Sequence, residues 1–148
     1  MSKISFRGQL PIGTQDHIRL KTIKGQVGYK ITKFQILPGR PGLDDCELVC
    51  KIFTKTQTGA ISAVVNFTES DMIGAAYYAN NSTYSFQGQS DAVLFDNSVT
   101  NQDIFVTMDD ASSNTNPANY YIELETMKLS DLETTKLTLQ SLRDIASQ

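Results

Sequence analysis

Residues 119–147 read NYYIELETMKLSDLETTKLTLQSLRDIAS, and the spacing of the apolar residues changes within this stretch near Ser130. Before that point, Tyr120, Ile122 and Leu124 alternate with other residues, which is the period of a half-buried β-strand. After it, leucines recur at the spacing of one helix face. The stretch therefore predicts a last strand followed directly by an amphipathic helix.

The rest of the chain, from about residue 4 to residue 128, reads as short strands separated by turn residues. The strongest break is Pro38-Gly39-Arg40-Pro41-Gly42. Crossover helices, which a parallel sheet would need, are not visible in the pattern. We therefore predict a mainly β protein of one domain, residues 1–148. The expected architecture is an antiparallel, jelly-roll-like β-sandwich with a C-terminal α-helix over about residues 130–147.

Two local patterns predict details of the sandwich. Apolar residues from Val27 to Ile31 share one face, whereas Phe34 and Ile36 continue in the opposite phase, which is typical of a β-bulge or a corner. The run from Ile61 to Phe67 alternates, and we expect it to form a hairpin with the strand around residues 46–53.

A short helix is expected directly after this hairpin. Thr68 resembles a helix N-cap, and Asp71 stands three residues later, where a carboxylate favours a helix start. The pattern predicts a helix from about Glu69 to Gly74.

Cys46 and Cys50 are the only cysteines, and both fall in the strand expected around residues 46–53. Four strand residues span roughly 13 Å, whereas a disulfide needs Cα atoms within about 7 Å. We therefore expect two buried, unbridged thiols. A metal site is not expected here, because no histidine or further cysteine lies nearby in the sequence.

The charge balance and the termini exclude some partners. The formal net charge is -3 and the pI is about 5.0, which argues against nucleic-acid binding. Apolar runs do not approach the ~18 residues of a membrane span, so no membrane partner is expected. Residues 1–8 lack the apolar core of a signal peptide, so we expect synthesis and folding in a cytoplasm.

Candidate catalytic residues are few. His17 is the only histidine, and we interpret it as an ordinary strand-end residue, because no nucleophile motif accompanies it. Acidic residues gather at 44–47, 109–110 and 123–125, but their spacing singles out no glycosidase pair. Asp109 and Asp110 with Asn114 or Asn116 form a weak calcium pattern. Phosphate-binding glycine loops are absent from the sequence. We therefore predict no enzyme, no cofactor and no resident metal.

The C-terminal helix is one candidate interaction surface. Ser130 to Glu133 form a capping box, and Leu132, Leu139 and Leu142 lie on one helix face. This face either packs on its own sandwich or contacts a neighbouring subunit or a shell. A second candidate surface is provided by tyrosines, among them Tyr77 and Tyr78, because tyrosine is favoured in protein interfaces.

Three stretches together resemble a known class of proteins. They are residues 10–22 (LPIGTQDHIRLKT), residues 93–97 (VLFDN) followed by 101–107 (NQDIFVT), and residues 119–125 (NYYIELE). In this order, with a leucine-rich tail, they resemble small virion structural proteins of tailed phages of marine and other aquatic bacteria. The resemblance covers most of the chain and carries no catalytic signature.

The resemblance implies a function at the virion, with assembly in the host cytoplasm. It implies a capsid decoration or cement protein that binds the major capsid protein lattice and stabilises the head. Such proteins are homo-oligomers, with trimers favoured. The alternatives left open are other virion partners, as in a head–tail connector, a tail or a fibre component, and a glycan-binding attachment module. The resemblance assigns no residue as a contact.

Overall fold

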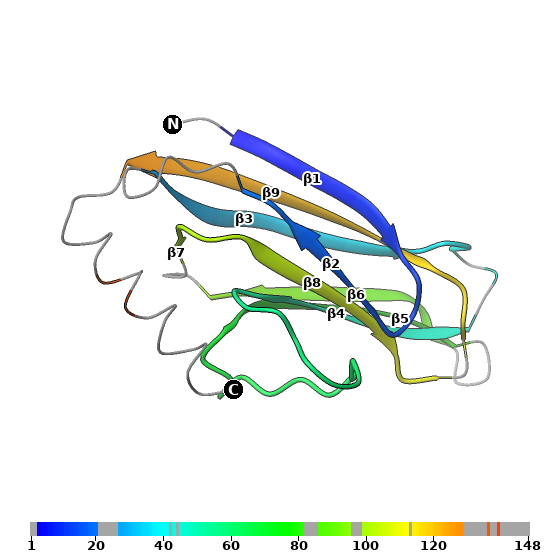
Figure 1. The fold of residues 1–148 in the computed structure, drawn as a ribbon. Coiled ribbons are helices and arrows are strands. Elements are labelled where there is room, and N and C mark those ends of the chain that lie inside the picture. Colours follow the sequence, from blue (N-terminus) through cyan, green and yellow to red (C-terminus); the bar gives the residue numbers. More distant parts are fainter. Residues whose placement is uncertain are drawn as a thin grey trace.

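Two antiparallel sheets packed face to face make up the fold of the computed structural model (Figure 1). The structure describes residues 3–20, 27–41, 43, 45–81, 86–95, 99–112, 114–128, 136 and 139. The first sheet contains, in spatial order, β1 (Lys3–Leu10), β9 (Ala118–Lys128), β3 (Val27–Pro38) and β7 (Val99–Thr100). The second contains β2 (Thr14–Ile18), β8 (Ile104–Asp110), β4 (Cys46–Phe53), β5 (Met72–Asn81) and β6 (Phe86–Leu94).

The core lies between the sheets and is built from alternate residues of each strand. Along β9, Tyr120, Ile122 and Leu124 are buried while the residues between them are partly exposed, as the alternation of the sequence predicts. β4 and β8 supply the opposite wall with fully buried side chains, namely Leu48, Cys50, Ile52, Ile104, Val106 and Met108. The predicted mainly β sandwich is therefore confirmed.

The predicted C-terminal helix lies almost entirely outside the described residues. Of its proposed contact residues, Leu132 and Leu142 are not described, and Leu139 is described as exposed. The helix and its partner therefore stay predictions.

The phase change in the third strand is a β-bulge. The register of β3 against β9 shifts between Ile31, which faces Leu124, and Lys33, which faces Glu123. Thr32 is the extra residue, so Phe34 and Ile36 still point into the core. Of the two alternatives left by the sequence, the structure shows the bulge.

Two predictions between residues 54 and 71 are wrong. β4 does not pair with residues 61–67, because β5 and β8 occupy its two edges. Residues 54–71 contain no described strand and instead cross the outer face of the second sheet as a long loop, seen below β4 in Figure 1. The expected helix at 69–74 is a turn followed by the start of β5, because Ile73 packs in the core between the sheets and Met72 packs with Phe53 and Ala75 in a smaller apolar cluster.

The cysteine interpretation is confirmed, since Cys46 and Cys50 are free, buried and on β4. Burial raises the pKa of the Cys50 thiol well above its usual range, because the thiolate would lose its hydration.

We predict that the folded protein reacts with a thiol reagent only as fast as it unfolds, and that the denatured protein reacts at both thiols. The colour released by an aromatic disulfide, followed with and without denaturant, measures this. Rapid native reaction of either thiol would contradict the buried position of β4.

Candidate functional site

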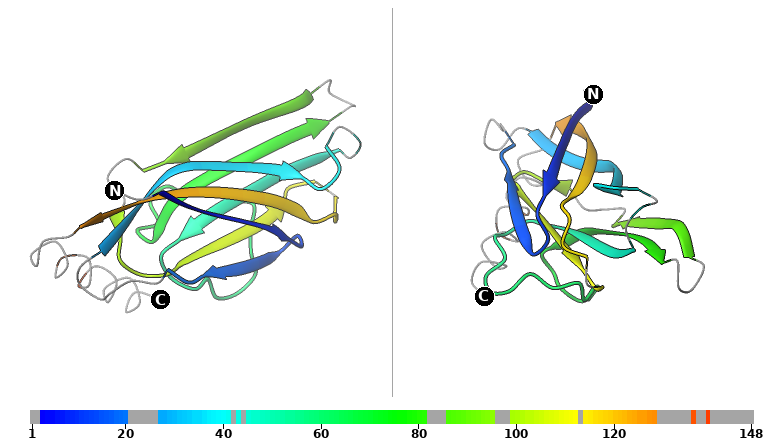
Figure 2. Two further views of the ribbon diagram at one scale, coloured as in Figure 1. Left: turned by 90° about the horizontal axis from the view of Figure 1, so that it is seen from above. Right: turned by 90° about the vertical axis from the view of Figure 1, so that its right-hand side faces the viewer.

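A groove opens along one side of the sandwich because the fourth strand of the first sheet is very short. β7 pairs with β3 only at Tyr29 and Lys30. Beyond this point, from Ile31 to Leu37, the same edge of β3 has no partner strand among the described residues. Seen from above, β5 and β6 extend past β3, the last long strand of the first sheet (Figure 2). The second sheet is therefore wider than the first on this side.

The groove has a volume of about 520 Å³ and lies between the two sheets. The first sheet contributes residues 34–37 of β3 and residues 119–121 of β9, and the second contributes residues 76–77 of β5 and residues 90–92 of β6. Ala92 pairs with Ala76, which itself pairs with the core residue Cys50, so all three face the first sheet. Yet Ala92 is exposed, because no described strand of the first sheet covers it.

The groove includes only part of the surface suggested by the tyrosines. Tyr77 is exposed at the rim of the groove, but it alternates with the inward-facing Ala76, so its side chain points to the outer face of the second sheet, next to Asp91 of β6. Tyr78 points the other way and packs against the core, so it does not share that surface. Leu37 has 53% of its surface exposed beside the groove, although sequence analysis did not select it. The signal was its position next to Ile36, where the strand alternation calls for a polar residue.

Tyr120, at the base of the groove, joins the two sheets. Its side chain is buried, and its hydroxyl donates a 2.6 Å hydrogen bond to Oδ2 of Asp16 on β2. Burial, and then the hydrogen bond to this carboxylate, raise the pKa of Tyr120 above its usual range. The bond links β9 of one sheet to β2 of the other, so it fixes their relative position.

We predict that Tyr120→Phe lowers the free energy of unfolding by about 1.5–3 kcal/mol, the range for hydrogen bonds to charged groups. The effect should depend on pH. The folded protein keeps the Tyr120 proton above pH ~10, where an unfolded tyrosine loses it. This contribution to stability is therefore complete below pH ~10 and is lost as the pH rises through the raised pKa. Urea unfolding at neutral and alkaline pH measures this. The free energy of unfolding should fall less between the two pH values in the variant than in wild type. Equal alkaline losses would contradict the assignment.

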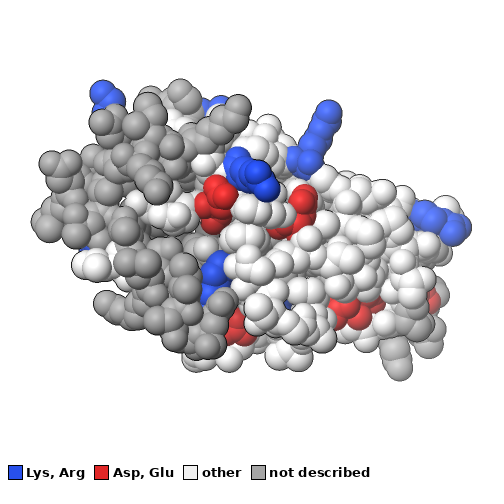
Figure 3. All heavy atoms as spheres, in the orientation of Figure 1, with Lys and Arg blue, Asp and Glu red and all other residues white. Residues whose placement is uncertain are grey.

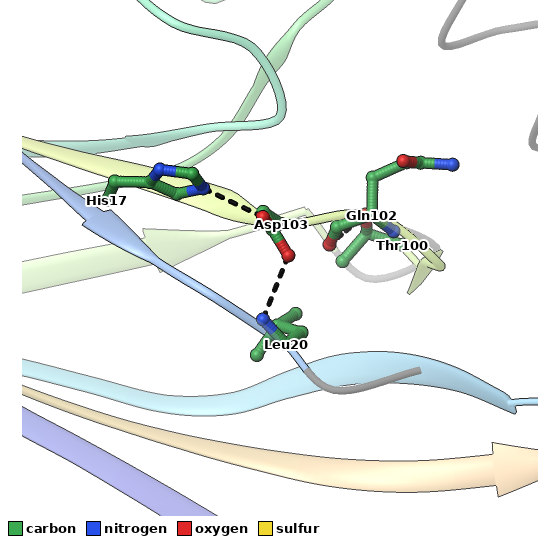
Figure 4. A network of polar contacts seen from close by, with 5 residues as sticks. All are labelled: His17, Leu20, Thr100, Gln102 and Asp103. Carbon is green, nitrogen blue, oxygen red and sulfur yellow. Dashed lines mark hydrogen bonds and ion pairs between the residues drawn. The ribbon is translucent and has the colours of Figure 1, made fainter. Parts of the chain in front are cut away.

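His17 belongs to a surface contact between β2 and the start of β8 (Figure 4). Its Nε2 lies 2.7 Å from Oδ2 of Asp103, and its ring stacks on Phe105 at 4.5 Å. Oδ1 of Asp103 accepts the backbone N–H of Leu20 at 2.9 Å. Thr100 and Gln102 are nearby but bond to each other. Among the described residues, the side chain of His17 hydrogen-bonds only Asp103, so the arrangement positions two chain segments.

Asp110, one of the acidic residues considered for calcium, is hydrogen-bonded to its own loop and to β4. The carboxylate of Asp110 accepts hydrogen bonds from the backbone and hydroxyl of Ser112, from the Asn114 amide and from the backbone of Glu47. Within the part of the chain that the structure describes, no three acidic, histidine or cysteine side chains converge as a metal site. The loop donors instead stabilise the turn that follows β8.

Charged residues on the face shown in Figure 3 are scattered, and a broad uncharged area separates them. Among the described residues of this face, neither sign gathers into a patch. The described residues include no helix long and apolar enough to cross a membrane.

No protein-family model matches the chain, and no curated protein matches it significantly.

Proposed function

We propose that this protein is a capsid decoration protein of a tailed phage, which binds the major capsid lattice and stabilises the head. The observation that carries the proposal is the strand order. Without β6, the sheets read β1-β9-β3-β7 and β2-β8-β4-β5, which is the order of an eight-stranded jelly roll with two Greek keys. Viral capsid proteins are one class that uses this architecture. β6 adds a ninth strand at the free edge of β5.

The fold alone does not specify function, so the surface supplies the second part of the support. Large apolar side chains are exposed at Leu37 and Tyr77 beside the groove, and at Val64 and Phe67 on the long loop. Exposed apolar groups of this kind favour contacts with other proteins. A capsid lattice repeats each contact many times, and multivalent attachment can raise avidity by roughly 10²–10⁴. The resemblance of residues 10–22, 93–97, 101–107 and 119–125 to small virion proteins agrees with this role.

Copy number tests the proposal. Mass-spectrometric quantification in purified particles should find this chain in a fixed, high ratio to the major capsid protein, and cryo-electron microscopy should place it on the outside of the head. Heads that lack it should rupture at a lower temperature, and purified protein added back should restore their resistance. A few copies at the tail or the neck would overturn the decoration role and indicate a connector, tail or fibre component.

A further inference from the structure

Among the described residues, no strand continues β7 along the edge of β3, and the open space there has the dimensions of a further strand. The unpaired edge of β3 extends from Ile31 to Leu37 among the described residues. An unpaired edge exposes backbone N–H and C=O groups that can bond to an added extended segment. A groove bounded by such an edge therefore favours a polypeptide strand over a compact small molecule.

The second sheet, which forms the floor of the groove, also has inward-facing positions that no described strand covers. Ala92 and Ser90 of β6 point toward the first sheet by register, and both are exposed. In a completed sandwich these inward positions would be covered. The side chains on this floor, Ala76, Ser90 and Ala92, are small, which leaves room for larger apolar side chains from an added strand.

The chain itself contains a segment with strand character that is not in a strand. Residues 61–67, ISAVVNF, alternate like a half-buried strand and carry no charge. In the structure they belong to the long loop on the outer face of the second sheet. Val64 has 71% of its surface exposed, and Val65 and Phe67 are exposed as well.

Contacts within the subunit hold this segment in place while leaving its apolar residues exposed. The Lys51 ammonium donates a 2.7 Å hydrogen bond to the Val64 carbonyl, and the Phe67 ring packs edge-on against Phe95 at 5.3 Å. The segment is thus presented on the surface rather than folded into the core. Its seven residues, 61–67, equal in number the seven of the open edge, 31–37, each roughly 23 Å when extended.

We propose that residues 61–67 of one copy add as a strand to the open β3 edge of a second copy of this chain. The donor segment and the acceptor groove are different surfaces, so the contact is head-to-tail and closes into a ring where the rotation between copies permits. The added strand completes the first sheet and covers Ala92. This self-association does not depend on the proposed role at the capsid.

Size-exclusion chromatography with light scattering, on the full chain, tests the interface. Wild type should be oligomeric. The donor variant Val64→Asp/Val65→Asp places a charge on both faces of the segment, and the acceptor variant Ala92→Trp fills the groove. Each should be monomeric. Val93→Trp is the matched control, because Val93 neighbours Ala92 in sequence but faces away from the first sheet. It should assemble as wild type does.

Mixing the two interface variants gives the sharpest result. The donor variant retains an intact groove and the acceptor variant retains an intact segment, so an equimolar mixture should form one-to-one heterodimers and nothing larger. A wild type that is monomeric at every concentration would overturn the proposal. So would oligomers that survive both substitutions, or a mixture that stays monomeric.

A peptide experiment keeps the proposal testable should Ala92→Trp fail to fold. A synthetic ISAVVNF peptide, added to the donor variant, should shift the backbone amide resonances of residues 34–37 and 90–92. A peptide with Val64 and Val65 replaced by Asp should leave them unmoved. Equal responses to both peptides, or none to either, would overturn the proposed strand addition.

Discussion

Leu124→Ala should lower the free energy of unfolding by about 2–5 kcal/mol, the range for deleting a fully buried leucine side chain. Leu124 lies on β9, the central long strand of the first sheet, and its exposed surface is 0%. Its strand neighbours are Ile4 on β1 and Ile31 on β3. The substitution would leave a cavity among these strands, because close-packed sheets collapse only partly around a lost side chain.

Leu37→Ala provides the matched control, since it makes the same chemical change on an adjacent strand. Leu37 is 53% exposed, so its removal should cost less than about 1 kcal/mol. Urea unfolding followed by circular dichroism measures both variants, and the slope against denaturant should remain that of wild type. Measured under conditions where wild type is monomeric, equal losses for the two variants would show that β9 is not at the centre of the core.

Much of the sandwich could be predicted because alternation reports burial directly. The strand at Cys46–Phe53 was expected with the bounds that β4 has. The bulge in β3 was visible as a phase change, because an extra residue at Thr32 is the simplest way to keep both Ile31 and Phe34 in the core. In these strands, the local pattern and the tertiary environment agree.

Residues 61–67 show where alternation fails as a predictor. The pattern states which side chains could be buried by a sheet, but a strand also needs a free neighbouring edge. Both edges of β4 are taken by β5 and β8, so the segment has no edge to join within its own subunit. Sequence alone contains no information on this competition.

The groove could not be predicted for a related reason. It depends on the short length of β7 and on β6 extending the opposite sheet, and both are properties of the strand order. The one local signal was the pair Ile36-Leu37, in which consecutive apolar residues point to both faces of the strand. Tyr77 and Tyr78 were named together as a candidate surface; Tyr77 is exposed, whereas Tyr78 faces the core, and the sequence does not distinguish them.

The helix expected to start at Thr68 does not form, because the backbone N–H and hydroxyl of Thr68 are hydrogen-bonded in a turn. The side-chain oxygen of Asn66 accepts hydrogen bonds from the backbone and the hydroxyl of Thr68, at 3.0 and 2.6 Å. An Asn side chain that accepts a hydrogen bond from the backbone two residues ahead stabilises a turn, and this competes with a helix that a Thr would cap. Asp71 then points into the protein, where it closes the long loop.

Asp71→Ala should lower the free energy of unfolding by about 1.5–3 kcal/mol, because it removes a charge-assisted hydrogen bond in a buried setting. Oδ2 of Asp71 accepts a 2.7 Å hydrogen bond from Nε2 of Gln57, and it lies 4.0 Å from the Lys55 ammonium. The Asp71 side chain is buried, so in the variant one N–H of the Gln57 amide would lose its acceptor. The end of the loop would thus lose its carboxylate link to Lys55 and Gln57, whereas the Thr54 hydroxyl would keep its 3.3 Å hydrogen bond to the backbone carbonyl of residue 71.

Asp71→Asn is the informative comparison, since an amide oxygen can still accept from Gln57 while the attraction to Lys55 is lost. It should cost less than Asp71→Ala in the same urea titration. Limited proteolysis gives a local measurement. Cleavage between residues 54 and 71 should accelerate in Asp71→Ala more than in Asp71→Asn, because the main remaining closure would be the hydrogen bonds that the Thr54 backbone N–H and hydroxyl donate to the carbonyl of residue 71, at 2.8 and 3.3 Å. An Asp71→Ala protein with unchanged stability and unchanged cleavage would mean that the loop is held by its apolar contacts alone, with Phe67 on Phe95 the first of them to examine.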